Sequence, residues 1–206
     1  MRLLVLLHGF EDAPERLGAI VSEIDPTDGA MTVVAPRGPH DLGNGPSWLG
    51  SQDPDPDDVA VTLDQLDALV DEECSRLEIG RDAVVVGGFS QGGAAALALT
   101  LRAGDRAPVG GCFVLAGFLW PPPAVDYSFD RAAGATPVLV VHGRDDDVIA
   151  VQQGRSAARL LDRRGLAVTY REHPDAGHEL HPAYLADVRS WLAAVARGEQ
   201  PSDPPA

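Results

Sequence analysis

The chain has 206 residues, of which 45% are hydrophobic, and this supports one full core because domains commonly hold roughly 100–200 residues. It carries 16 basic and 31 acidic residues, and the resulting net charge of −15 disfavours nucleic acid and anionic membrane surfaces as partners. Every basic residue is an arginine. The lack of lysine excludes Schiff-base chemistry, pyridoxal phosphate anchoring and a Walker A phosphate loop.

The two cysteines, Cys74 and Cys112, lie far apart in the chain. Neither has the closely spaced Cys or His neighbours that a zinc site or a redox dithiol requires, so both are predicted to be buried free thiols, and no metal or cofactor is expected. The apolar run at the N-terminus is shorter than the ~7–15 residues of a secretory signal, and no stretch reaches the ~20 apolar residues of a membrane span. We therefore expect a cytoplasmic protein without integral membrane association, as a monomer or a homodimer.

Five short apolar segments rich in Val and Leu predict strands, and they are continuous rather than alternating, which is typical of strands covered on both faces. A sixth strand, 167–171, has a weaker signal and is placed where the alternation of strands and helices requires one. Segments with the apolar spacing of helices lie between the strands. In chain order the predicted elements are strand 2–7, helix 14–24, strand 31–35, helix 58–77, strand 83–87, helix 91–102, strand 111–116, strand 137–141, helix 152–164, strand 167–171 and helix 182–196. This alternation predicts an α/β fold with a mostly parallel sheet and helices on both faces. We expect the chain to form one domain over residues 1–197, followed by a flexible tail over 198–206.

Parallel sheets place their chemistry in the loops at the carboxyl ends of the strands. The strand 83–87 runs there into Gly88-Phe89-Ser90-Gln91-Gly92, a Gly-x-Ser-x-Gly pattern in which the glycines leave room for a sharp turn at the serine. Such a serine lies at the N-terminus of a helix, where N–H groups favour a developing negative charge. Ser90 is therefore the candidate nucleophile, and the alternative is a tight turn whose serine only caps the helix.

A serine nucleophile needs a base to take its proton and an acid to orient that base, and in hydrolases with this turn the chain order is Ser, then Asp or Glu, then His. The order is met here, because three aspartates at 145–147 follow a predicted strand and His178 lies in a loop before the last helix. The residues alone do not rank the three aspartates. His173 is the alternative base, but Pro174 follows it directly at a strand end.

Further motifs are spread over nearly the whole chain: Leu7-His8-Gly9-Phe10, Pro36-Arg37-Gly38, Ser47-Trp48, Gly88-Phe89-Ser90-Gln91-Gly92-Gly93-Ala94, the run 142–149 with His-Gly-x-x-Asp, and Gly177-His178-Glu179. With these motifs the sequence resembles the α/β-hydrolases, and among them the group of small carboxylesterases, phospholipases and acyl-protein thioesterases. Phe-Ser-Gln-Gly-Gly is the most specific of the motifs.

The resemblance implies roles that the spacing leaves open. In this group the acid stands four residues after the histidine of the His-Gly turn, which selects Asp146, and the Gly-His-Glu setting supports His178 as the base. The oxyanion hole is expected at two backbone N–H groups. One belongs to Gln91, directly after the nucleophile, and the other to Phe10, after the first strand.

Three departures from the group lie beside the expected site: Glu11 replaces a glycine, Leu49 replaces an aromatic residue, and Ala150 replaces a proline. They bear on the substrate range more than on the type of reaction. The resemblance also implies that the first two strands of larger hydrolases are missing, so that the sheet has six strands. The segment 124–136 is too short to form a helical lid domain.

The acyl chain of a substrate is expected to contact Trp48, Phe118, Leu119 and Trp120 in an open pocket, and packing of the loop interior is the alternative role for Trp120. The expected activity is that of a serine carboxylesterase that hydrolyses short- to medium-chain acyl esters through an acyl-enzyme on Ser90. The alternatives are an acyl thioesterase or a lysophospholipase that uses the same residues, and a non-catalytic binding module of this fold. Apolar pockets discriminate by only ~1–3 kcal/mol per methylene, so the sequence does not fix the chain length.

Overall fold

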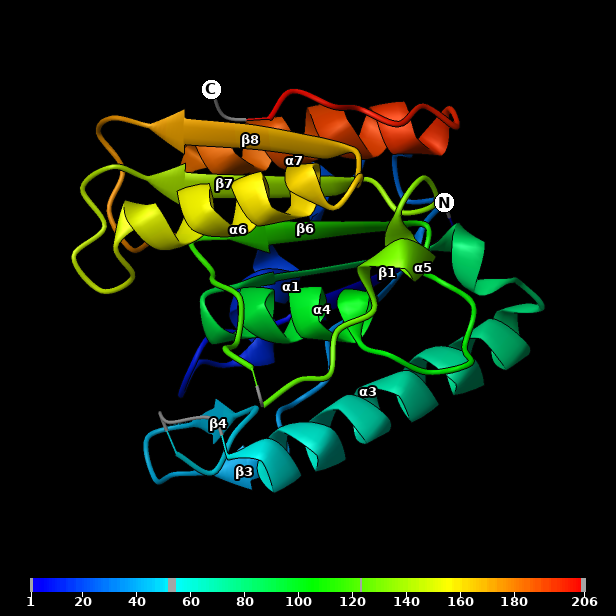
Figure 1. The fold of residues 1–206 in the computed structure, drawn as a ribbon, viewed down its shortest axis with the longest axis horizontal. Helices are drawn as coiled ribbons and strands as arrows, with labels where there is room; N and C mark the ends of the chain where they lie inside the picture. Colours follow the sequence, from blue (N-terminus) through cyan, green and yellow to red (C-terminus); the bar gives the residue numbers. More distant parts are fainter. Residues whose placement is uncertain (1, 52–54, 123, 205–206) are drawn as a thin grey trace.

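The computed structural model describes residues 2–51, 55–122 and 124–204. Its centre is a six-stranded sheet (Figure 1). From edge to edge the strands are β2 (Thr32–Val34), β1 (Leu3–Leu7), β5 (Val84–Phe89), β6 (Gly111–Leu115), β7 (Val138–Gly143) and β8 (Val168–His173). Each neighbouring pair is parallel. The predicted α/β fold with a six-stranded parallel sheet is confirmed.

The strands are continuously apolar because both faces of the sheet are covered. In β1, Leu3, Val5 and Leu7 belong to the core on one face, whereas Leu4 and Leu6 belong to the core on the other. All five side chains are fully buried. Successive side chains of a strand point to opposite faces, so one apolar run fills two cores.

The helices form a layer on each face. The helices α3 (Pro56–Leu77), α4 (Gln91–Leu101), α5 (Phe129–Ala132) and α6 (Val151–Arg163) contribute to one core. The helices α1 (Pro14–Ala19), α2 (Val21–Ile24) and α7 (Pro182–Ala196) contribute to the other. The predicted single helix over 14–24 is thus two helices. They are separated at Ile20, whose N–H bonds to the carbonyl of Leu17, three residues back, and tightens the turn there.

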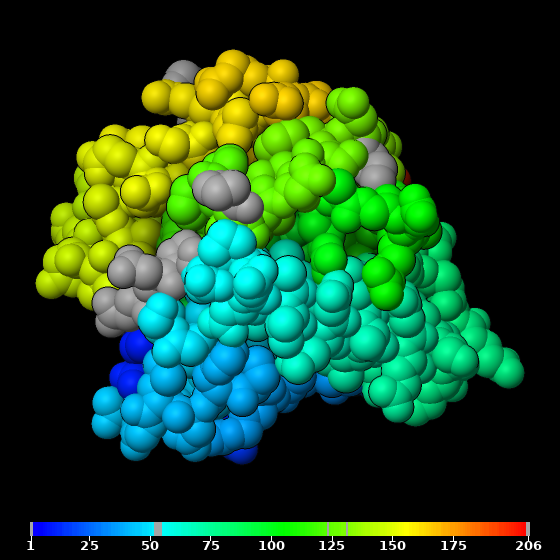
Figure 2. Space-filling view, turned by 60° about the horizontal axis from the view of Figure 1, so that its bottom comes forward, coloured from blue at the N-terminus to red at the C-terminus, as the bar shows by residue number. Residues whose placement is uncertain are grey.

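An excursion between β2 and α3 was not predicted from the sequence. It contains the two-stranded antiparallel pair β3 (His40–Asp41) and β4 (Pro46–Ser47). In the space-filling view its light blue residues lie against the start of α3 (Figure 2). The hydroxyl of Thr62 on α3 donates a hydrogen bond of 2.6 Å to the carbonyl of Trp48, which fixes the end of the excursion to this helix.

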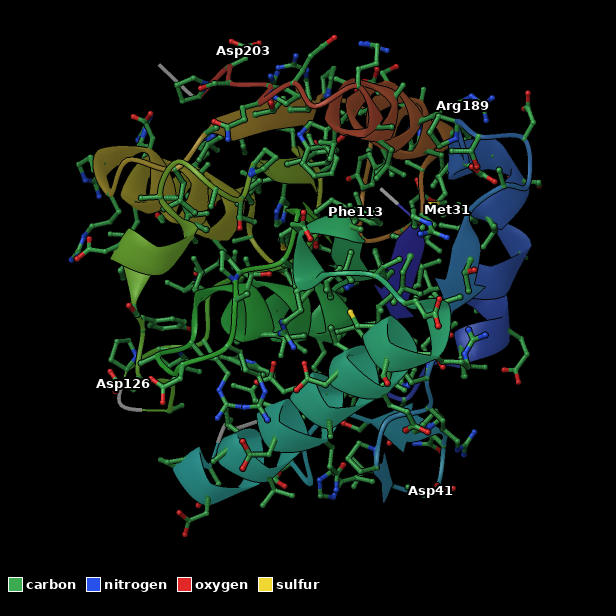
Figure 3. The ribbon with its side chains drawn as sticks, turned by 90° about the vertical axis from the view of Figure 1, so that its right-hand side faces the viewer. Met31, Asp41, Phe113, Asp126, Arg189 and Asp203 are labelled. Carbon is green, nitrogen blue, oxygen red and sulfur yellow. The ribbon has the colours of Figure 1, made fainter. Side chains whose placement is uncertain are left out.

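Several smaller expectations concern segments away from the sheet centre. Cys74 and Cys112 are buried free cysteines, as predicted. In the tail, Asp203 pairs with the edge strand β8, because its carbonyl accepts from the N–H of Tyr170 and its N–H donates to the carbonyl of Val168 (Figure 3). This part of the tail therefore lies against the sheet. In the part of the chain that the structure describes, no helix combines the length and the apolar character that crossing a membrane requires.

Candidate active site

Ser90 lies at the turn between β5 and α4, in a strained backbone conformation. Its φ of 55° and ψ of −120° are outside the regions that L-residues usually occupy, and such strain costs about 1–3 kcal/mol. The glycines around it are required by space: a Cβ on Gly88 would overlap the backbone of Gly92, and a Cβ on Gly92 would overlap the carbonyl of Leu7. The N–H of Ser90 donates a 2.9 Å hydrogen bond to the carbonyl of Leu115 on β6, which anchors the turn to the sheet.

The structure brings Ser90, His178 and Asp146 together in one hydrogen-bonded path. The distance from Ser90 Oγ to His178 Nε2 is 2.9 Å, and the distance from His178 Nδ1 to Asp146 Oδ2 is 2.8 Å. Ser90 and Asp146 are buried. Because the Asp146 carboxylate only accepts, the hydrogen of His178 lies on Nδ1, and Nε2 is left to accept the hydrogen bond from the Ser90 hydroxyl.

Of the three aspartates at 145–147, only Asp146 contacts the histidine among the described residues. Its second oxygen, Oδ1, accepts from the backbone N–H groups of Val148 at 3.0 Å and Ile149 at 2.7 Å. Asp145 and Asp147 are exposed to solvent. The turn thus buries one carboxylate, with backbone donors on one oxygen and His178 on the other.

The two histidines in the His-Gly turns are fully buried and serve as structural anchors. His8 Nε2 accepts a hydrogen bond of 2.9 Å from the N–H of Gly38, and His142 Nε2 donates to the carbonyl of Ile149 at 2.8 Å. Burial lowers the pKa of both imidazoles, which keeps them neutral. The Ile149 contact closes the loop that carries Asp146.

The remaining candidate base, His173, is engaged elsewhere. Its Nε2 lies 2.7 Å from the carboxylate of Asp187 on α7. His181 caps the start of α7, where its Nδ1 accepts from the N–H of Ala183 at 3.2 Å. Among the described histidines, only His178 is hydrogen-bonded to Ser90.

Two backbone N–H groups are available near Ser90. Gln91 is the first residue of α4, where a helix leaves its N–H groups without partners. Phe10 lines the same cavities as Ser90. In residues 2–51, 55–122 and 124–204, neither N–H group makes a hydrogen bond to the protein. Both N–H groups are therefore free to donate to a ligand.

The side chain of Gln91 has a role that the sequence did not reveal. Its Oε1 accepts hydrogen bonds from the hydroxyl of Ser47 at 3.1 Å and from the N–H of Trp48 at 3.0 Å. The β3–β4 excursion is thereby fastened to the residue that follows Ser90. The Gln-Gly-Gly motif predicts only the role of its backbone N–H, so it does not indicate this side-chain contact.

Two adjacent cavities open beside Ser90, and they share Phe10, Ser90 and Val148 as lining residues. The first, here called the apolar lobe, measures about 250 Å³ and is lined by Phe10, Ser90, Gln91, Phe118, Val148 and Ile149. The second, here called the polar lobe, measures about 340 Å³ and is lined by Gly9, Phe10, Glu11, Asp12, Arg16, Phe89, Ser90, Val148, His178 and Glu179. A substrate with its reacting carbon at Ser90 can therefore extend in two chemically different directions.

The predicted acyl contacts are corrected in part. Phe118 lines the apolar lobe, but Leu119 packs against the core. Trp48 and Trp120 are only 2% and 1% exposed and lie inside that core. Trp48 is held there because its indole N–H donates to the carbonyl of His8 at 2.8 Å and its ring stacks on the imidazole.

Two apolar residues that line the cavity were missed. Val148 is 63% exposed, and it borders both lobes, while Ile149 borders the apolar lobe. The available signal was their position two and three residues after the acid, in a loop that follows a predicted strand. As for metals, the described residues contain no group of three or more His, Cys, Asp or Glu side chains that could hold an ion.

Comparisons with known proteins concern the chain as a whole. The model of the phospholipase/carboxylesterase family matches residues 1–196. A probable inactive carboxylesterase of Oryza sativa subsp. japonica is 28% identical over 211 residues, which cover 94% of this chain and 84% of that protein. Lysophospholipase-like protein 1 of Mus musculus is 31% identical over 135 residues, which cover 65% of this chain and 55% of that protein. The match thus spans about half the length of the mouse protein.

Among solved structures, Arabidopsis thaliana SOBER1 superposes with a TM-score of 0.79 at 23% sequence identity. The superposition covers 95% of this chain and 99% of that chain, and at this identity it shows the fold alone. The fold is the one predicted from the motifs, and the family model covers almost all of the sequence. The chain therefore belongs to the phospholipase/carboxylesterase family, whose members have the α/β-hydrolase fold.

Proposed function

We propose that the protein is a serine carboxylesterase that hydrolyses short- to medium-chain acyl esters, with Ser90 as nucleophile, His178 as base and Asp146 as the orienting acid. The observation that carries the proposal is the hydrogen-bonded path through these three side chains, with bonds of 2.9 and 2.8 Å. The three groups come from turns far apart in the sequence. A binding module gains nothing from holding them in this order and geometry.

In the first half-reaction, His178 Nε2 takes the proton of Ser90 as Oγ attacks the ester carbonyl carbon. The negative charge on the carbonyl oxygen is stabilised by the backbone N–H groups of Gln91 and Phe10. The bond from the carbonyl carbon to the alcohol oxygen then breaks, and His178 gives its proton to that oxygen. Asp146 stabilises the imidazolium that exists between these two transfers.

In the second half-reaction, water replaces the alcohol. His178 takes a proton from the water, whose oxygen attacks the acyl carbon, and then returns the proton to Ser90 Oγ as the carboxylic acid leaves. No step requires a metal, a lysine amine or a redox group. The proposed mechanism therefore uses three side chains, two backbone N–H groups and a water molecule.

A fluorophosphonate probe tests the nucleophile directly. We expect a mass increase on Ser90 in the folded protein and no labelling in Ser90→Ala or His178→Ala, with the fold of both variants checked by circular dichroism. Loss of a nucleophilic triad member costs on the order of 10⁴-fold or more in turnover. Folded wild-type protein that takes up no probe would contradict the proposal.

The apolar lobe is proposed as the acyl pocket. Phe118→Trp adds volume there and should shift the preference toward shorter chains, by about tenfold in the ratio of kcat/KM for nitrophenyl octanoate and nitrophenyl acetate. Trp120→Phe serves as the control, because Trp120 lies in the core and not in the lobe. An unchanged ratio in Phe118→Trp would place the acyl chain elsewhere.

A second candidate is hydrolysis of lysophospholipids or thioesters by the same residues. The name of the mouse relative favours lysophospholipids, and the name of an acyl-protein thioesterase 1 homolog of Dictyostelium discoideum favours thioesters. Relative kcat/KM values for a nitrophenyl ester, an acyl-CoA thioester and a lysophosphatidylcholine of one chain length separate these activities. The name of the rice relative raises the further alternative of a protein without activity. Turnover that is lost in Ser90→Ala would exclude that alternative.

A further inference from the structure

The polar lobe differs from the apolar lobe in charge. Its lining includes three carboxylates, those of Glu11, Asp12 and Glu179, and one guanidinium, that of Arg16. The lining of the apolar lobe contains no charged residue. A substrate that spans both lobes therefore meets a strongly asymmetric electrostatic environment.

The position of His178 decides which part of a substrate enters which lobe. His178 lines the polar lobe and not the apolar one. In the proposed mechanism it must protonate the oxygen of the leaving alcohol, so that oxygen lies within hydrogen-bond reach of Nε2. The leaving group therefore extends into the polar lobe, and the acyl chain extends into the apolar lobe.

Two of the three carboxylates in the polar lobe have no cationic partner among the described residues. Asp12 is paired with Arg16, whose guanidinium lies 3.3 Å away. Among the described residues, the carboxylate of Glu11 accepts hydrogen bonds only from the neutral amide of Asn44, at 3.2 and 3.3 Å. Within the described part of the chain neither Glu11 nor Glu179 forms an ion pair, and Glu179 is exposed. The lobe thus carries an excess of two negative charges.

We propose that the polar lobe selects esters whose leaving alcohol carries a positive charge, such as an ammonium alcohol, over neutral and anionic leaving groups. The inference rests on the proposed function, because it assigns the leaving group by the role of His178. A cation is attracted into the lobe by Glu11 and Glu179, whereas a phosphate or sulfonate is repelled. Glu11 contributes although glycine is common at this position in the group that the sequence resembles.

The test compares two substrates of nearly equal shape. Butyrylcholine and 3,3-dimethylbutyl butyrate differ in one atom, the nitrogen or carbon at the centre of the trimethyl group, and hence in one charge. At low ionic strength we expect kcat/KM for butyrylcholine to exceed that for the neutral ester by roughly tenfold. The ratio should fall toward one as salt screens the field. An anionic ester, 3-sulfopropyl butyrate, should be the slowest of the three.

Variants that remove either a negative or a positive charge from the polar lobe show whether charge, and not altered packing, sets the ratio of kcat/KM values. Glu11→Gln and Glu179→Gln should each lower the cationic-to-neutral ratio by about threefold, while Arg16→Gln, which frees Asp12, should raise it by a similar factor. Glu72→Gln is the matched control. Glu72 is exposed on the last part of α3, which leads into the amino end of β5, and the site lies at the carboxyl ends of the strands. The cationic-to-neutral ratio of Glu72→Gln should equal that of the wild type.

The outcomes distinguish this inference from the proposed function. A ratio near one that responds to none of the lobe variants, with the neutral ester still hydrolysed, overturns the charge selectivity and leaves the esterase in place. A ratio that changes equally in Glu72→Gln and Glu11→Gln also overturns it, because the effect then reflects the net charge of the protein. Hydrolysis of neither ester, together with an unlabelled Ser90, overturns both proposals.

Discussion

Replacing Asp146 by asparagine tests the proposed triad most sharply, because the structure dictates how the amide would sit. Oδ1 of Asp146 accepts from the N–H groups of Val148 and Ile149, whereas Oδ2 lies 2.8 Å from Nδ1 of His178. In Asp146→Asn the amide oxygen must remain at the two N–H donors. The NH₂ group then faces His178 and donates to Nδ1.

The consequence is a change of tautomer. With Nδ1 accepting, the hydrogen of His178 moves to Nε2, which lies 2.9 Å from Ser90 Oγ and can no longer take the serine proton. Rotating the amide would restore the tautomer but would set NH₂ against two N–H donors, at a cost of about 1–3 kcal/mol for each donor left unsatisfied. We therefore expect kcat/KM to fall by about 10⁴-fold, equivalent to ~5.5 kcal/mol of transition-state stabilisation.

The assay is the hydrolysis of nitrophenyl butyrate, with unfolding followed in parallel by differential scanning calorimetry. The two backbone hydrogen bonds are retained, so Asp146→Asn should unfold within a few degrees of the wild type. Asp145→Asn and Asp147→Asn make the same chemical change on exposed neighbours and should keep kcat/KM within about twofold. If Asp146→Asn retains more than a tenth of the activity, or if either neighbour loses as much, the reasoning is refuted.

Three further predictions concern the framework. Gly92→Ala should destabilise the fold by about 3 kcal/mol or more in chemical denaturation, because the new Cβ would overlap the carbonyl of Leu7. Burial raises the pKa of Cys112 to about 12, so mass spectrometry should find this thiol unmodified by iodoacetamide at pH 8 until urea unfolds the chain. Hydrogen bonds from Arg155 lower the pKa of Glu172 from 4.5 to about 2, so the carboxylate contributes stability above pH 4.5 that is lost as the pH falls toward 2. Glu172→Gln should accordingly lower Tm at pH 7, and the difference from the wild type should shrink below pH 4.5.

Much of the fold was predictable because its signals are local. Continuous apolar runs located five of the six strands, since a strand buried on both faces leaves little room for polar residues. The sixth, β8, contains polar residues and is only partly buried, and it was predicted because the alternation of strands and helices requires a strand there. The helix over 182–196 was predicted with the bounds that the structure has, because Pro182 starts it and an apolar stripe continues to its end. The elements that were missed are β3, β4, α5 and a 3₁₀ turn at Arg81–Ala83, which have only two to four residues each and are too short to show a period.

For the candidate site, the order of residues along the chain predicted the three turns but not every residue on them. The order placed a serine, an acid and a histidine on three turns, but the choice of Asp146 from 145–147 depended on the family resemblance. In the structure the choice follows from burial and from two N–H donors, which are properties of the folded turn. The same limit explains why Trp48 was expected to contact the acyl chain. The residues next to it in the sequence do not distinguish a side chain that lines a pocket from one that packs in the core. The contact that holds it in the core is with His8, forty residues away.

The precision of the triad comes from the register of the sheet, since hydrogen bonds connect its turns from strand to strand. The N–H of Ser90 bonds to the end of β6, the N–H of Ala116 to Val141 on β7, and the N–H of Arg144 to His173 at the end of β8. A slip of one residue in any of these pairings would move a turn by about 3.3 Å, more than hydrogen bonds of 2.8 and 2.9 Å can absorb. The edge strand β2 lies outside this series, so its register does not set the distances between the three side chains. The geometry of the proposed chemistry is therefore held by β5, β6, β7 and β8, while the loops beyond them can vary the charge of the lobes.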